Sequence, residues 1–272
     1  MHEKISLAGD LGSGKSTVAK IITERLGMEY YSTGTICRAV AARHGIDVAQ
    51  MNKYMETHPE LDHEIDDGLV ALSNDDRPLL IDSRMAWHFV RDTFRVYLTT
   101  EMAVSALRIF NAKRTEESFA TVEETERSVK TRRASETKRY MELYGVNNHD
   151  LANYDLVLDT TYASPDEIAD CMAEAYAAWQ KDRSIRACYL SPLRLYYPAE
   201  REEGESRPDL LAERIEAGER PTVDVCFDGD RFCVASDPDV ALAYSLSSLP
   251  LVPCRLIPGK VEGEFVRMSD TL

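Results

Sequence analysis

Short apolar runs alternate with stretches of helical period along the first two thirds of the chain. Residues 5–8 have the pattern of a buried strand, and residues 17–26 repeat their apolar side chains at helical spacing. A second helical stretch follows at residues 35–44. Three more strands and a helix are predicted at residues 79–82, 95–98, 155–159 and 165–180. Strands that alternate with helices favour a parallel sheet covered on both faces.

The pattern changes beyond residue 180. Residues 198–220 are highly charged, and we interpret them as a linker that contains one helix at 209–217. We therefore expect two domains with a boundary near residue 190. The first is an α/β domain at residues 1–190, and the second is a small α+β accessory domain at residues 191–272.

Most of the elements of the expected accessory domain follow the charged linker. Two alternating runs, 222–227 and 231–234, are joined by an Asp-Gly turn and predict a β-hairpin. A short helix is predicted at 240–245. Residues 251–257 predict an edge strand, because Pro253 has no N–H to donate to a neighbouring strand.

Residues 9–17 match the G-x-x-x-x-G-K-[ST] pattern of a phosphate-binding loop, between a predicted strand and a predicted helix. The glycines allow the backbone to curl so that successive N–H groups point at phosphate oxygens. Lys15 can reach the β- and γ-phosphates, and the Ser16 hydroxyl can bind Mg²⁺. The residues expected to bind ATP are Gly9, Gly12, Ser13, Gly14, Lys15, Ser16 and Thr17.

Two polar groups follow predicted elements where a second ligand could meet the nucleotide. Asp82 comes directly after a buried run; it is either a polar strand exit or a carboxylate that holds Mg²⁺ through water, with Arg84 close enough to touch an acceptor phosphate. Ser32, Gly34 and Arg38 follow the first helix. Taken alone, they favour a helix N-cap with a surface arginine, and a phosphate-binding group is the alternative.

Two charged segments have both a structural and a functional interpretation. Asp62 and Asp66 share one helix face, which is typical of a solvated acidic surface; alternatively they accept hydrogen bonds from a sugar or an amino-bearing base. Residues 108–139 are rich in arginine and glutamate, as in a solvated helical hairpin. Arginines on a mobile hairpin could also close over transferring phosphates. Lys113 and Arg114 have no assigned role in this segment.

The composition limits the range of partners. Lys plus Arg number 32 against 47 Asp plus Glu, a net charge of −15 that argues against a general nucleic-acid or anionic-membrane surface. The six cysteines form no C-x-x-C pair and no His/Cys metal spacing, which favours reduced thiols. No signal peptide or membrane-spanning run is evident. We therefore expect a cytoplasmic protein with no nucleic-acid or membrane partner.

Laid end to end, these segments resemble the cytidylate kinase-like family, especially its compact archaeal-type members, over about residues 4–175. The matching motifs are residues 9–17, 31–38, 51–54, 58–66, 81–87, 132–140, 144–146 and 154–160. The resemblance implies a P-loop NTPase fold, with a three-layer parallel sheet and a helical lid. It also implies transfer of the γ-phosphoryl group of ATP to CMP or dCMP in the presence of Mg²⁺.

The same resemblance implies roles for individual residues. Lys15, Arg132 and Arg139 would be catalytic, the last two as lid arginines, and Ser16 and Asp82 would form the metal site. The acceptor would be bound by Ser32, Gly34, Arg38, Asp62, Asp66 and Arg84. The chain differs from the family pattern at Asp67-Gly68, where the family is basic, and at Ser83, where glycine is usual. These differences lie in the acceptor half of the expected site.

Residues 221–257 are similar to a ParB/sulfiredoxin-like fragment, with an Asp-Gly hairpin, a small-residue helix and a Val-Pro-x-Arg strand. The Gly-His/Cys-His-Arg stretch with which such modules handle phosphate is replaced by residues 236–239. We expect an accessory or regulatory module without catalysis of its own. Two other functions stay open: an ATP-binding regulatory protein with a kinase-like sensor domain, and a P-loop kinase for another small acceptor. We expect a monomer or a weak homo-oligomer.

Overall fold

The computed structural model describes most of the chain. The described ranges are residues 3–46, 48–112, 119–199, 207–259 and 262–270. Lys113 and Arg114 lie outside the described residues, as does the most acidic part of the predicted linker.

Contacts divide the chain into two compact units. Unit 1 comprises residues 1–156 and 165–185, and unit 2 comprises residues 157–164 and 186–272. Strand β5 (Leu156–Asp159) therefore begins in unit 1 and continues in unit 2. The expected domain boundary near residue 190 stays a prediction.

Unit 1 contains a parallel sheet in the order β4-β1-β3-β2. Its strands are β1 (Lys4–Gly9), β2 (Glu29–Ser32), β3 (Leu79–Asp82) and β4 (Phe94–Thr99). Its helices are α1 (Lys15–Leu26), α2 (Thr33–His44), α3 (Val48–Met55), α4 (Pro59–Ala71), α5 (Ala86–Phe89), α6 (Met102–Asn111), α7 (Val122–Tyr144) and α8 (Pro165–Lys181). Two 3₁₀ turns are η1 (Leu72–Asn74) and η2 (Leu151–Asn153).

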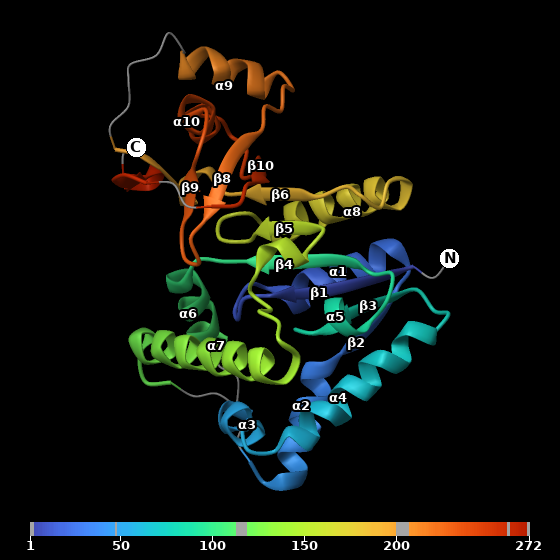
Figure 1. Ribbon diagram of the computed structural model, residues 1–272. Coiled ribbons are helices and arrows are strands. Elements are labelled where there is room, and N and C mark those ends of the chain that lie inside the picture. Colours follow the sequence, from blue (N-terminus) through green and yellow to red (C-terminus); the bar gives the residue numbers. More distant parts are fainter. Residues whose placement is uncertain (1–2, 47, 113–118, 200–206, 260–261, 271–272) are drawn as a thin grey trace. The chain divides into compact units, whose positions relative to one another are not determined.

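Helices cover both faces of this sheet. All six residues of β1 are buried, which requires cover on both sides because successive side chains point to opposite faces. Helix α1 packs against α8 and β3, and α5 contacts β1. Beside the sheet, α7 contacts both α6 and α3, as Figure 1 shows. These features confirm the predicted P-loop α/β fold with a helical lid.

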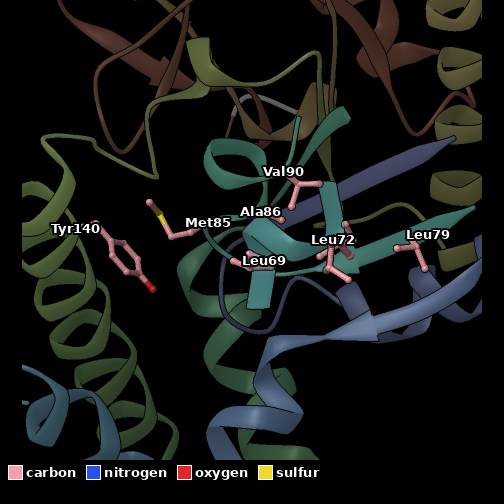
Figure 2. Close-up of a cluster of buried hydrophobic side chains, with 8 residues drawn as sticks. Leu69, Leu72, Leu79, Met85, Ala86, Val90 and Tyr140 are labelled. Atoms are coloured by element: carbon pink, nitrogen blue, oxygen red, sulfur yellow. The ribbon is translucent and has the colours of Figure 1, made fainter. Parts of the chain in front are cut away.

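A cluster of buried side chains ties the lid helix α7 to the core of unit 1. The cluster joins α4, η1, β3 and α5, and its members are Leu69, Leu72, Leu79, Ile81, Met85, Ala86, Val90 and Tyr140. Tyr140 is the member from α7, and Figure 2 shows its ring extended toward Met85. Burial of an aromatic ring contributes roughly 2 kcal/mol, so this contact anchors α7 near its C-terminal end.

Unit 2 is a mixed sheet in the order β11-β7-β9-β8-β10-β6 with two short helices. Its strands are β6 (Ala187–Leu190), β7 (Leu195–Pro198), β8 (Val223–Phe227), β9 (Phe232–Val234), β10 (Val252–Leu256) and β11 (Phe265–Arg267). Its helices are α9 (Pro208–Glu216) and α10 (Pro238–Leu246), with 3₁₀ turns η3 (Pro192–Arg194) and η4 (Met268–Asp270). Helices α9 and α10 pack against each other. The predicted small α+β region is thus confirmed, while its ParB/sulfiredoxin-like character stays a prediction.

The prediction that residues 251–257 form an edge strand was wrong. Strand β10 lies between β6 and β8, antiparallel to the first and parallel to the second. Its pairing with β8 begins at Cys254, one residue after Pro253. Pro253 thus stands outside the β8 ladder, although it pairs with Tyr189 in the β6 ladder.

Two further observations concern the chain as a whole. Among the described residues, none of the helices has the length and apolar character needed to cross a membrane. The six cysteines, all of which lie within the described ranges, are free thiols.

A buried ion pair fixes the end of β5 within unit 2. Asp159 is 0% exposed, and its Oδ1 accepts a hydrogen bond from Arg194 Nη1 at 3.0 Å. Its Oδ2 accepts a hydrogen bond from the backbone N–H of Ser191 at 3.1 Å. The N–H of Thr161 donates to Oδ1 at 3.0 Å. The carboxylate thus connects β5 to η3 and compensates the charge of Arg194.

We expect Asp159→Asn to lower the free energy of unfolding by about 3 kcal/mol, because it removes the carboxylate charge that pairs with the buried Arg194. The measurement is a urea titration followed by circular dichroism. Asp224→Asn is the matched control, since Asp224 pairs with an Arg255 side chain that is largely exposed. A midpoint for Asp159→Asn equal to that of the control would contradict the assignment.

Candidate active site

The predicted phosphate-binding loop connects β1 to α1. Gly9 has a φ of 151°, and a Cβ placed there would stand 2.3 Å from the carbonyl oxygen of Leu98. Gly14, with a φ of 79°, precedes α1, and a Cβ there would meet no atom within 4 Å. Glycine at position 9 therefore lets β1 and β4 approach each other. At position 14 the backbone is open to a ligand at the N-terminus of α1.

Lys15 folds back over the loop. Its Nζ donates hydrogen bonds to the carbonyl oxygens of Gly9, at 2.9 Å, and Asp10, at 2.6 Å. An ammonium group has three N–H donors, so one is left for a phosphate oxygen. Burial lowers the pKa of Lys15 to about 8, against the opposing effect of the Asp82 carboxylate. The half-buried lysine is thus held against the loop by these two hydrogen bonds.

The other residues expected to bind ATP differ in exposure. Ser16 and Thr17 are exposed in the first turn of α1. Ser13 is buried, and its hydroxyl donates to the carbonyl of Asp10 at 2.8 Å, so its side chain stabilises the loop itself.

Asp10 holds the loop to the end of β4, a contact that sequence analysis did not anticipate. Its carboxylate accepts hydrogen bonds from Tyr97 Oη at 2.8 Å, Thr99 Oγ1 at 3.0 Å and the Thr100 N–H at 3.0 Å. Arg133 of α7 lies 3.8 Å away. Burial alone would raise the pKa of Asp10, but Arg133 and these hydrogen bonds hold it below its ordinary value. The loop and the lid helix are thereby linked through one carboxylate.

Asp82 ends β3 beside the phosphate-binding loop. Tyr30 Oη donates to Asp82 Oδ2 at 2.7 Å, and the Ser16 hydroxyl lies near enough to lower the pKa of Tyr30. Ser16 and Asp82 thus place two oxygen groups of the type that Mg²⁺ prefers in the neighbourhood of Tyr30. Within the described ranges no cluster of three or more His, Cys, Asp or Glu side chains occurs. A Mg²⁺ ion carried by a nucleotide needs only one or two protein oxygens, so this pair fits it.

Arg84 and Arg132 share one buried carboxylate. Arg84 Nε lies 2.5 Å from Glu136 Oε2, and Arg132 Nε donates to Glu136 Oε1 at 3.0 Å. Glu136 is only 2% exposed. Burial alone would raise its pKa, but the two guanidinium groups hold it below the ordinary range. One ionised carboxylate thus fixes two arginines side by side.

The aspartates of α4 are buried, so the interpretation of a solvated acidic face was wrong. Asp62 Oδ2 lies 3.1 Å from Arg139 Nε, and both side chains are 6% exposed. Burial raises the pKa of Asp62 to about 6 despite this arginine. Asp66 accepts a hydrogen bond from Tyr144 Oη, and burial raises its pKa as well. Contacts across α4 and α7, which no local pattern reveals, turn this face inward.

The remaining predicted acceptor residues lie at the start of α2. A Cβ on Gly34 would stand 3.5 Å from Ser32 Oγ and 3.6 Å from Arg38 Nη1, so these three residues are neighbours. Ser32 occupies the N-cap position of α2, but its side chain makes no capping hydrogen bond. The N-cap interpretation is therefore right for the position of Ser32 and wrong for its hydroxyl.

Electrostatics show that the two halves of the site meet. Burial raises the pKa of Cys37 on α2, while the charges of Arg84, Arg132 and Arg139 lower it. Burial lowers the pKa of Lys15, the charges of Asp82 and Glu136 raise it, and that of Arg84 lowers it. The loop, the end of β3 and one face of α7 thus surround a common charged centre.

A cavity of about 420 Å³ borders this centre. Its walls include Leu11 of the loop, Lys53 of α3 and Arg132 of α7. Ser135 Oγ hydrogen-bonds Glu56 Oε1 across the same gap, which connects α7 to α3. The size is within the range of small-molecule sites.

Sequence reasoning missed three residues that organise the site: Asp10, Tyr30 and Glu136. Glu136 stands four residues after Arg132, and this i, i+4 spacing is the one signal that could have indicated the ion pair. Asp10 and Tyr30 act on partners that are distant in sequence, so no local pattern marks them.

Comparisons with known proteins show which family the chain is similar to. The profile of the Cytidylate kinase-like family matches residues 4–162. Cytidylate kinase of Thermoplasma volcanium is 32% identical over 170 residues, which are 61% of this chain and 87% of that protein. Cytidylate kinase of Sulfurisphaera tokodaii is 33% identical over 183 residues, which are 66% of this chain and 98% of that protein.

A third relative is a larger protein. It is an S-adenosylmethionine-dependent nucleotide dehydratase of Lacinutrix mariniflava, 36% identical over 186 residues. The match covers 68% of this chain but only 37% of the dehydratase. The chain thus spans little more than a third of that relative.

We expect nucleotide affinity to weaken as pH rises through about 8, because Lys15 then loses the charge that faces the phosphates. Since the pKa of Lys15 is lowered, its proton leaves earlier than that of an ordinary lysine, and ADP affinity should fall by up to about tenfold per pH unit above this point. Calorimetric titration with ADP from pH 7 to pH 9.5 measures this. Lys15→Met should bind weakly with no such pH dependence, and wild-type affinity that stays constant to the end of the range would contradict the expectation.

Proposed function

Because the chain belongs to the cytidylate kinase-like family and is thereby an ATP-dependent phosphotransferase, we propose that it transfers the γ-phosphoryl group of ATP to CMP or dCMP. The products are ADP and CDP or dCDP. Two of its relatives, each largely covered by this chain, are cytidylate kinases. The acceptor half of the site supports the same acceptor class.

One observation carries the proposal: Arg84 and Arg132 contact the same buried carboxylate beside Lys15. Two guanidinium groups against one Glu136 leave a net positive charge for an acceptor phosphate. Guanidinium groups bind phosphate oxygens in a fixed geometry. Because Glu136 holds both arginines before substrate arrives, little reorganisation is needed on binding.

The Asp62 carboxylate supports an acceptor that carries a nucleoside in addition to its phosphate. No group among the described residues donates a hydrogen bond to the buried Oδ2 of Asp62, although Arg139 Nε stands 3.1 Å away. A buried carboxylate oxygen without a donor is costly. The amino group of cytosine, or a sugar hydroxyl, can supply that donor.

The phosphate-binding loop would form the part of the site that binds the phosphoryl donor, ATP. Its backbone N–H groups and the third N–H of Lys15 would bind the β- and γ-phosphates. Mg²⁺, held by Ser16 and Asp82, would neutralise charge on those phosphates. An oxygen of the acceptor phosphate attacks the γ-phosphorus in line, and the bond to the β-phosphate oxygen breaks. Arg132 and Arg139 of the lid stabilise the charge that spreads over the transferring oxygens.

The regulatory alternative is separated from the kinase by an acceptor panel. The protein is incubated with Mg·ATP and each of CMP, dCMP, UMP, AMP and GMP, and ADP formation is followed with a coupled assay. We expect CMP and dCMP to give the highest kcat/KM. If another nucleotide gave the highest kcat/KM, that nucleotide would replace CMP as the proposed acceptor. If the protein bound ATP but no acceptor stimulated ADP release, the regulatory function as an ATP sensor would be favoured.

We expect Arg84→Gln to raise the KM for CMP by about tenfold or more, because a charge-assisted contact to the acceptor phosphate is lost. The affinity for ATP should change little. Arg77→Gln is the matched control, since Arg77 pairs with Asp75 and Glu29 at the surface of the same unit. Equal KM values for CMP in the two variants would contradict the role of Arg84.

A further inference from the structure

Tyr30 makes an unusual contact for an exposed tyrosine. It lies on β2 with 47% of its surface exposed. Its hydroxyl nevertheless donates to Asp82 Oδ2 at 2.7 Å, across 52 positions of sequence. A phenol at the surface can satisfy its hydroxyl with water, so a bond to a carboxylate at the end of β3 marks a specific arrangement.

The hydroxyl of Tyr30 connects three segments of the site. Burial and the Asp82 carboxylate raise its pKa, and the nearby hydroxyls of Ser32 and Ser16 act in the opposite direction. Ser16 belongs to the first turn of α1, Asp82 ends β3, and Ser32 precedes α2 without capping it. The phenol oxygen is therefore the common neighbour of both proposed metal-binding groups.

We propose that Tyr30 is a positioning residue for Mg²⁺, which fixes the Asp82 carboxylate through Oδ2 and leaves Oδ1 for the ion or its bound water. The inference rests on the proposed function, because Ser16 and Asp82 hold the metal only in that function. A carboxylate held at one oxygen loses less rotational freedom when the other meets a cation. Partners of this kind raise metal affinity without touching the metal.

The contact also distinguishes Tyr30 from its neighbour. Tyr31, the next residue of β2, packs against the hydrophobic cluster that contains Leu69 and Ile81. Successive strand residues face opposite sides, so the two tyrosines offer the same chemistry in two environments. Removing one hydroxyl at each position gives a matched pair of variants.

The test measures metal binding directly, with Mn²⁺ as the probe. Free Mn²⁺ is followed by electron paramagnetic resonance during titration of the full chain in the presence of ADP. We expect Tyr30→Phe to weaken Mn²⁺ binding in the ternary complex by about tenfold. Tyr31→Phe should match wild type. Metal-free ADP affinity and the melting temperature of Tyr30→Phe should stay at wild-type values, which a merely structural role would not allow.

The outcomes separate this inference from the proposed function. Equal Mn²⁺ affinity in wild type and Tyr30→Phe would overturn the inference, and tighter binding in Tyr30→Phe would do so too. Asp82→Asn is the reference: if it binds Mn²⁺ as wild type does, the metal assignment and the inference fall together. If Tyr30→Phe weakens Mn²⁺ binding but no nucleoside monophosphate is phosphorylated, the inference stands and the acceptor proposal fails.

Discussion

The burial of Glu136 between two arginines is the constraint on which the rest of the site depends. A carboxylate that is 2% exposed stays ionised only where positive charge compensates it, and Arg84 and Arg132 supply that charge. Arg84 comes from the exit of β3, whereas Arg132 and Glu136 both belong to α7, so it is the Arg84–Glu136 pair that holds the lid helix against the sheet. Burial makes the charged carboxylate costly, and the same exclusion of water strengthens the electrostatic attraction between the two arginines and a phosphate that binds there.

Neighbouring contacts support this arrangement from three sides. Tyr140 anchors α7 in the apolar core, Arg139 pairs with Asp62 of α4, and Arg133 approaches Asp10 of the loop. Each side chain comes from the same helical segment but meets a different element. The lid helix is therefore fixed relative to the loop and to the proposed acceptor residues by charge as well as by packing. Phosphoryl transfer requires such positioning more than it requires covalent chemistry.

Elements could be predicted from the sequence where a local pattern is compatible with only one backbone structure. The loop from Gly9 to Lys15 follows a buried strand, and glycine is needed there for backbone reasons, so its place in the fold could be predicted. Glu136 could not be singled out, because one more glutamate in a charged helix looks solvated. The burial of Asp62, like the central place of β10 despite Pro253, depends on partners distant in sequence. Such pairings are set by the tertiary structure and leave no local periodicity.

The central claim is that γ-phosphoryl groups pass from ATP to a cytidine monophosphate held by this charged cluster. Phosphorus NMR of the protein with Mg·ATP and CMP tests it directly, because it identifies the product that receives the phosphorus. The account predicts that the γ-phosphate resonance of ATP declines while the β-phosphate resonance of CDP grows by the same amount. Release of inorganic phosphate in its place, or ATP that remains intact, would contradict the account.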